Sequence, residues 1–136
     1  MLTIGKLAAL ADVRTDTLRY YEREQLLTPV SKRQSGYRVY DKDAVRRIRF
    51  IKQAQQCGFT LSEIRQLLTL RVQASACCGD VRKLAVEKKQ QLECKIRTMR
   101  AMSKALDRLI SECAGDAHPI DDCSILSALD RGVGSQ

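Results

Sequence analysis

This sequence is poor in several residue types, and each shortage excludes a class of protein. It has one His, no Trp and two Pro among 136 residues. With a single His, no nucleophile–base pattern and no Gly-rich phosphate loop, an enzyme is not expected. The chain also has no apolar run long enough to span a membrane and no long apolar signal core near Met1. We therefore expect a cytoplasmic protein that does not enter a membrane.

Acidic residues are too few to balance the basic ones. The chain has 24 Lys and Arg against 16 Asp and Glu, a net charge of +8. Residues 1–70 hold 13 basic and 7 acidic residues, a net +6, whereas residues 71–136 hold 11 and 9, a net +2. The first half therefore carries most of the field that attracts a polyanion such as DNA.

Two short amphipathic stretches open the chain. Thr3 can cap a helix over 4–11, and a second helix is predicted over 15–25 with Leu18 and Tyr21 facing inward. Two short helices at the start of a basic chain form a candidate helix-turn-helix. The second exposes side chains that can reach phosphates and base edges: Arg14, Thr15, Thr17, Arg19, Tyr20 and Arg23. The alternative interpretation is a solvated face of an ordinary helix pair.

A basic hairpin is predicted next, over 30–40. Ser35-Gly36 indicates a turn, and the alternating residues 37–40 indicate a strand. Lys32, Arg33 and Arg38 would then hold the DNA backbone, which makes the arrangement a winged helix-turn-helix.

Two more helices are predicted before residue 70. Asp41 can cap a helix over 42–56 that Gly58 ends, and Thr60 with Glu63 forms a capping box for a fourth helix.

A long helix is predicted over 81–113, because no Pro or Gly interrupts it. Its apolar residues follow the alternating spacing of a coiled coil, with Lys88 and Lys95 as polar exceptions. Such a stripe needs a partner to cover it. The stripe consists of Val81, Ala85, Lys88, Leu92, Lys95, Met99, Met102, Leu106, Leu109 and Cys113.

The six cysteines are Cys57, Cys77, Cys78, Cys94, Cys113 and Cys123. Four of them cluster near the ends of the long helix, which favours metal ligation by thiolates over disulfides, with a redox role as the alternative. Cys57 and Cys94 are expected to be small residues that are packed or partly exposed. A continuous helix would separate Cys78 from Cys113 by roughly 50 Å. In an antiparallel dimer, however, Cys78 of one subunit could meet Cys113 and Cys123 of its partner.

Four segments together resemble the MerR family of transcription regulators: Thr3-Ile4-Gly5-Lys6-Leu7-Ala8, Thr17-Leu18-Arg19-Tyr20-Tyr21-Glu22, Gly36-Tyr37-Arg38-Val39-Tyr40 and Gly58-Phe59-Thr60-Leu61-Ser62-Glu63-Ile64. The segment 123–129 is similar to the zinc-responsive activators of that family.

The resemblance implies a mainly α fold. A winged helix-turn-helix domain (1–70) is followed by a linker (71–80), an antiparallel coiled-coil dimerisation helix (81–113) and a metal-binding loop with a short helix and tail (114–136). It also implies a homodimer that binds double-stranded promoter DNA and, with metal, distorts it so that RNA polymerase engages both promoter elements. Implied DNA contacts are Arg19, Tyr20, Tyr37 and Arg38.

The implied metal ligands are Cys78 of one subunit with Cys113 and Cys123 of the other. Three or four sulfurs suit zinc, and also cadmium, lead or mercury. Zinc sensors of this type carry a second cysteine where this chain has Ala114, so we expect one metal ion per site. Cys77 and His118 are additional candidate ligands.

Overall fold

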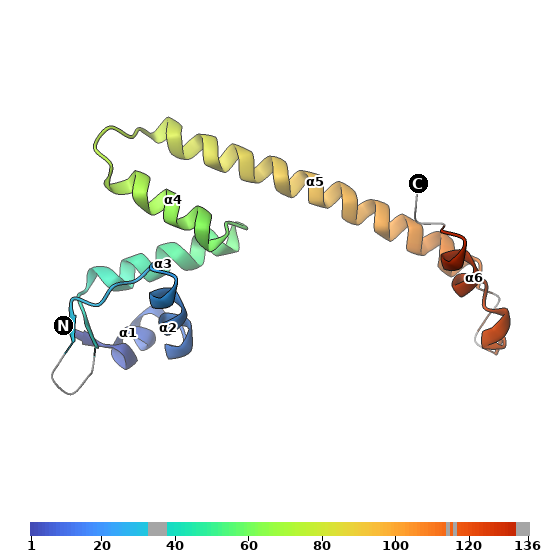
Figure 1. Ribbon diagram of the computed structural model, residues 1–136, viewed down its shortest axis with the longest axis horizontal. Coiled ribbons are helices and arrows are strands. Elements are labelled where there is room, and N and C mark those ends of the chain that lie inside the picture. The colour runs from blue at the N-terminus through green and yellow to red at the C-terminus, as the bar shows by residue number, and fades with distance from the viewer. Residues whose placement is uncertain (33–37, 114, 116, 133–136) are drawn as a thin grey trace. The chain divides into compact units, whose positions relative to one another are not determined.

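The computed structural model describes residues 1–32, 38–113, 115 and 117–132. Within these residues the chain is mainly helical, with six α-helices, three short strands and one 3-10 helix, which confirms the predicted fold class (Figure 1). It divides into two compact units, Met1–Ala85 and Val86–Gln136. None of the described helices combines the length and the apolar character needed to cross a bilayer.

Helices α1 (Ile4–Ala11) and α2 (Thr15–Arg23) form the predicted helix-turn-helix. The Thr3 hydroxyl accepts a hydrogen bond from the amide of Lys6 at 3.3 Å, which caps α1. Helix α1 ends because Asp12 adopts a left-handed conformation, with φ of 56°. Helix α2 ends two residues before the predicted position, and Gln25 just beyond it is also left-handed, with φ of 62°.

The wing is part of a three-stranded antiparallel sheet. Strands β2 (Ser31–Lys32) and β3 (Arg38–Tyr40) form the predicted hairpin. Strand β1 (Leu2–Thr3) adds to the other edge of β3, so the strand order is β1-β3-β2. Sequence patterns did not indicate β1, because two residues are too short to show an alternation.

Helix α3 (Asp43–Gln56) begins one residue after the predicted 42 and ends at the predicted 56, and helix α4 (Leu61–Val72) begins directly after its predicted cap, Thr60. The Asp41 carboxylate accepts from the amide of Ala44 at 3.2 Å. Gly58, with φ of 92°, follows α3 and allows the two backbone hydrogen bonds that close its C-terminus, Gly58 N to Gln55 O and Phe59 N to Ala54 O. Thr60 and Glu63 form the predicted capping box at α4.

The first unit has one continuous hydrophobic core. Helix α1 packs against both α2 and α3, and α3 packs against α4. Leu7, Leu18, Leu26, Ile48 and Ile64 are completely buried there. Because the apolar faces of four helices and strand β3 share this core, the exposed side of α2 is held on a rigid support.

Helix α5 (Cys78–Ser111) is the long helix. It begins three residues before the predicted 81 and ends two residues before the predicted 113. Helix α4 also continues to Val72, so the connection is shorter than the predicted linker 71–80. The earlier start of α5 follows from Asp80, whose carboxylate accepts from the amide of Cys77 at 2.9 Å and thereby satisfies a free donor at the helix start. A 3-10 helix (Ile120–Asp122) and α6 (Ser124–Asp130) follow.

Candidate DNA-binding surface and cysteine groups

The exposed side of α2 carries the residues predicted to contact DNA. The side chains of Arg14 and Arg19 are 86% and 55% exposed. Tyr20 is 41% exposed and lies 5.8 Å from the guanidinium carbon of Arg23, measured from its ring centroid. Thr15 and Thr17 are half-buried in the first turn of the helix. The structure therefore places Arg19, Tyr20 and Arg23 on the exposed side of α2. Arg14 and Thr17 line a separate cavity with Lys52, and Arg33 and Tyr37 lie outside the described residues.

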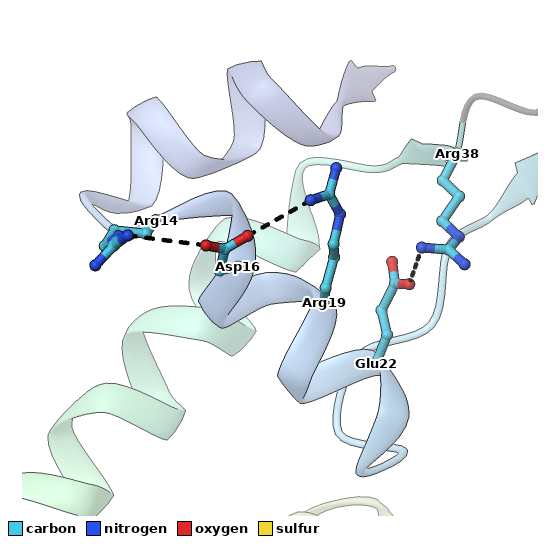
Figure 2. A network of polar contacts seen from close by, with 5 residues as sticks. All are labelled: Arg14, Asp16, Arg19, Glu22 and Arg38. Atoms are coloured by element: carbon cyan, nitrogen blue, oxygen red, sulfur yellow. Dashed lines mark hydrogen bonds and ion pairs between the residues drawn. The ribbon is translucent and has the colours of Figure 1, made fainter.

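An acidic side chain pairs with two of these arginines, and these pairs were not predicted from the sequence. Figure 2 shows the Asp16 carboxylate between two arginines, with Oδ2 3.8 Å from Arg14 Nη2 and Oδ1 3.5 Å from Arg19 Nη1. All three side chains are largely exposed, so the ion pairs contribute little to stability. The three-residue spacing of Asp16 and Arg19 within a helix could have indicated this pair from sequence.

Arg38, from strand β3, pairs with Glu22 of α2 (Figure 2). The distance from Arg38 Nη1 to Glu22 Oε2 is 2.8 Å, and the Glu22 side chain is only 10% exposed. No sequence spacing pointed to this contact, because the two residues lie on different elements. A cavity of about 400 Å³ is lined by Arg19, Glu22, Arg23 and Arg38. Three guanidinium groups and one carboxylate make it a positively charged cleft suited to phosphate.

Other basic residues of the same unit stabilise the fold instead. Lys52 of α3 donates to the carbonyl of Asp12 at 2.9 Å, beside the C-terminal end of α1. Arg65 of α4 donates to the carbonyl of Glu24 at 2.6 Å, just after α2. These cations satisfy carbonyls that the helix ends leave free and interact favourably with the helix dipoles. The net charge of the unit therefore overstates the charge available to DNA.

Tyr21, which faces inward next to Tyr20, also joins α2 to α3. Its hydroxyl donates to Gln55 Oε1 at 2.8 Å. Burial raises the pKa of this hydroxyl above its ordinary value, because the charged phenolate would lose water. Tyr21 therefore holds the buried side of α2 against α3.

Cys77 and Cys78 lie together at the start of α5, and both are exposed. The Asp80 cap holds the backbone of Cys77, and a Cβ built on Gly79 would lie 3.5 Å from the Cys77 sulfur. Cys78 is the first residue of the helix. Two thiols are therefore presented on an ordered turn.

Cys113 and Cys123 lie beyond the other end of α5. Cys113 is exposed two residues after Ser111, and Cys123 is half-buried as the residue that precedes α6. The hydroxyl of Ser124 donates to the carbonyl of Glu112 at 2.5 Å, which joins the start of α6 to the segment that carries Cys113. His118 is exposed in the intervening loop.

No group of three or more His, Cys, Asp or Glu side chains that could hold a metal ion occurs among the described residues of this single chain. Cys57 and Cys94, which were expected to be packed or partly exposed, are both exposed. Cys57 caps the end of α3, and Cys94 lies within α5.

A helix-turn-helix with a wing, whose recognition helix displays arginines on one exposed face, defines a DNA-binding protein. Two family models match: the MerR HTH family regulatory protein over residues 2–70, and the MerR DNA-binding family over residues 45–109. The chain belongs to the MerR family of transcription regulators, and it is not an enzyme.

Known relatives resemble this chain over nearly its whole length. It is 38% identical to the HTH-type transcriptional regulator ZntR of Escherichia coli K12, over 98% of this chain and 95% of that one. It is 33% identical to heavy metal-dependent transcription regulator 2 of Rhizobium meliloti, over 96% and 88%. Its structure is similar to that of PbrR691 from Ralstonia metallidurans in complex with lead(II), with a TM-score of 0.85, 36% identity and coverage of 95% and 99%.

Proposed function

We infer that this MerR-family protein is a metal-responsive activator that binds promoter DNA as a homodimer and senses a divalent thiophilic ion, zinc first among them. The observation that carries this proposal is the placement of the cysteines: two at the start of α5 and two beyond its end. Thiolates are ligands for zinc and for the heavier soft metals, and oxygen-preferring ions such as magnesium are not expected.

The dimer is supported by an apolar stripe on α5. Within the second unit, Leu92, Met99, Met102 and Leu106 remain 37% to 66% exposed. An exposed apolar stripe of this length on one helix is unfavourable in water unless a partner covers it. A second copy of α5 offers the same stripe, and the coiled-coil spacing suits helix-on-helix packing.

The proposed metal site combines the two cysteine pairs across the dimer. Helix α5 runs without interruption for 34 residues. At about 1.5 Å per residue its ends lie roughly 50 Å apart, so Cys78 and Cys113 of the same chain cannot share an ion. In an antiparallel dimer Cys78 of one subunit would meet Cys113 and Cys123 of the other. Cys77 and His118 are additional candidate ligands.

The residues present fit such an ion chemically. The four thiols of Cys77, Cys78, Cys113 and Cys123 are exposed or half-buried and none is in a disulfide, so all remain open to ligation. Three or four sulfur ligands around zinc make a tetrahedral site, and cadmium, lead and mercury accept the same donors. The likeness to a lead(II) complex and to a heavy metal-dependent regulator keeps those ions as the alternative to zinc.

Coupling to transcription would pass through α6. Metal binding at Cys113 and Cys123 would order the loop between them, and the Ser124–Glu112 hydrogen bond would transmit that order to α6. The docked α6 would shift the angle between the two DNA-binding units of the dimer. The distorted promoter would then present both of its elements to RNA polymerase.

Transcription in vitro, with each metal added separately, tests this proposal. Zinc should activate at the lowest free concentration. Cys123→Ser should leave DNA affinity nearly unchanged and abolish activation by metal, whereas Cys57→Ser, on α3, should activate normally. Normal activation of Cys123→Ser by zinc would refute the coupling scheme, and activation only by lead, cadmium or mercury would refute zinc as the signal.

Metal stoichiometry tests the number of ions per site. Titration of the metal-free dimer should saturate at two zinc ions, because Ala114 replaces the second cysteine needed for another ion. Saturation at four ions per dimer would contradict this. Adjacent thiols at Cys77 and Cys78 leave a redox sensor as a further alternative, and activation by peroxide without metal would favour it.

A further inference from the structure

The contact between Glu22 and Arg38 stands apart from the other ion pairs on the DNA-binding side. Asp16 pairs with Arg14 and Arg19 in water, with its own side chain 72% exposed. Glu22 is 10% exposed, and its Oε2 lies 2.8 Å from Arg38 Nη1. Its other oxygen, Oε1, is buried and has no hydrogen-bond partner in the described part of the chain. Arg38 is therefore the principal compensation for burying this carboxylate.

Burying a carboxylate costs desolvation free energy, and this one also places a negative charge beside the proposed DNA-binding surface. It weakens the attraction of nearby arginines for phosphate, since Arg19, Arg23 and Arg38 line the same cleft as Glu22. What it supplies is geometry, because an arginine whose Nη1 is bonded to a fixed carboxylate has a defined guanidinium plane. Arg38 itself stays 37% exposed, so its N–H groups that do not bond Glu22 remain available to a phosphate.

We propose that Glu22 is a positioning residue that locks Arg38 of the wing strand β3 to the recognition helix α2, so that helix and wing contact the DNA in one fixed register. The two elements are separate in sequence, and the ion pair joins them directly, so it can set their relation. Phosphate contacts fix the register of a protein on DNA. Glu22 would thereby increase discrimination between the operator and other DNA while lowering general electrostatic affinity. The proposal rests on the proposed contact of Arg38 with DNA.

The test compares two DNA duplexes. The first is a duplex selected by the wild-type dimer from a random-sequence library, and the second has the same bases in shuffled order. Glu22→Gln keeps the size of the side chain and removes its charge. The shuffled duplex should bind the variant as tightly as wild type or more tightly, whereas the selected duplex should bind more weakly. We expect the ratio of the two affinities to fall about fivefold, the scale of one contact between neighbouring residues.

Glu24→Gln is the matched control. Glu24 lies directly after α2, two residues beyond Glu22, and its carboxylate lies 3.5 Å from Arg65 of α4, with both side chains 40% exposed. Removing this charge should strengthen binding to both duplexes equally and leave the ratio unchanged. If Glu22→Gln behaves like Glu24→Gln, Glu22 is only a repulsive charge and the proposal is wrong.

Arg38→Gln separates the proposal from the contact on which it rests. This variant should bind both duplexes more weakly, with a salt slope reduced by about one, as for a lost phosphate contact. In that background Glu22→Gln should no longer change the affinity ratio. If Arg38→Gln binds both duplexes as tightly as wild type, the proposed DNA contact of Arg38 is wrong. If Glu22→Gln changes the affinity ratio equally with and without Arg38, only the coupling between the two residues is wrong. Thermal unfolding of each variant shows whether a lower affinity comes from loss of folded protein. Such a loss would weaken binding to both duplexes alike and leave the affinity ratio unchanged, which would contradict the proposal.

Discussion

The two units of this chain solve the burial problem differently. The first unit buries apolar side chains from four helices and a strand in its own core. In the second unit, among the described residues, Leu109 and Ala128 are the buried apolar side chains, while a row of leucine, isoleucine and methionine stays exposed on α5. The first unit therefore contains the interactions that stabilise it, whereas the exposed stripe of the second is the surface that the proposed dimer would cover.

The difference has a functional sense. In the proposed dimer, a rigid support would keep the arginines of α2 and β3 in place for DNA, whereas a helix covered by its partner would join the two DNA-binding units in one assembly. A sensor located at the ends of such a helix can act on both units at once.

The strongest test of the self-contained unit is Ile48→Ala, in the middle of its core. Ile48 is fully buried, and its truncation should lower the free energy of unfolding by about 3 kcal/mol. Leu10→Ala, on the exposed side of α1 with 54% exposure, should change it by less than about 0.5 kcal/mol. Urea unfolding of the full dimer measures both. Similar losses for the two variants would contradict the core described for this unit.

For the second unit, Leu92→Asp should break the dimer. A buried charge without a partner opposes association, and two-fold symmetry introduces it twice, so we expect the dimer dissociation constant to rise about 100-fold. Gln90→Asp makes a comparable change two residues earlier, on the opposite face of the helix at about 200°, and should leave the constant nearly unchanged. Analytical ultracentrifugation distinguishes them, and equal dissociation of both variants would exclude the stripe as the dimer interface.

The capping box of α4 tests how much a local hydrogen bond contributes to the stability of the first unit. Thr60→Ala removes the acceptor of the Glu63 amide and should cost about 1 kcal/mol of unfolding free energy. Thr69, on the same helix, donates its hydroxyl to the carbonyl of Arg65, a contact that adds little, so Thr69→Ala should be close to neutral. Chemical denaturation would contradict the role of the cap if Thr60→Ala were equally neutral.

The smallest expected effect concerns pH and Tyr21. Burial raises the pKa of the folded-state hydroxyl, so its contribution to stability is present below the unfolded-state pKa of about 10 and is lost as pH rises through the folded-state value. Tyr21→Phe should cost about 0.5 kcal/mol at neutral pH through the lost hydrogen bond to Gln55. The melting temperature of the variant should then fall less steeply than that of wild type above pH 10 or so. An identical alkaline decline of both proteins would show that Tyr21 is not its source.

Local signals in the sequence determined much of the first unit. Thr3, Asp41, Gly58 and Thr60 predicted helix ends correctly because capping depends on neighbours within a few residues. The periodic apolar pattern predicted the helix-turn-helix and the long helix, because helical periodicity also depends on residues only three or four positions apart. The strand Leu2–Thr3 was missed because its existence depends on pairing with Arg38–Tyr40, far along the chain.

The site divides in the same way. Sequence by itself identified the arginines of α2, the wing arginine and the cysteines around the long helix, since residue type and spacing are visible there. Only the tertiary structure decided which cations stabilise the fold, such as Lys52 at the carbonyl of Asp12, and which carboxylates pair with Arg19 and Arg38. Glu22 meets Arg38 because α1 packs against both α2 and β3, and such packing depends on contacts between residues that no local pattern relates.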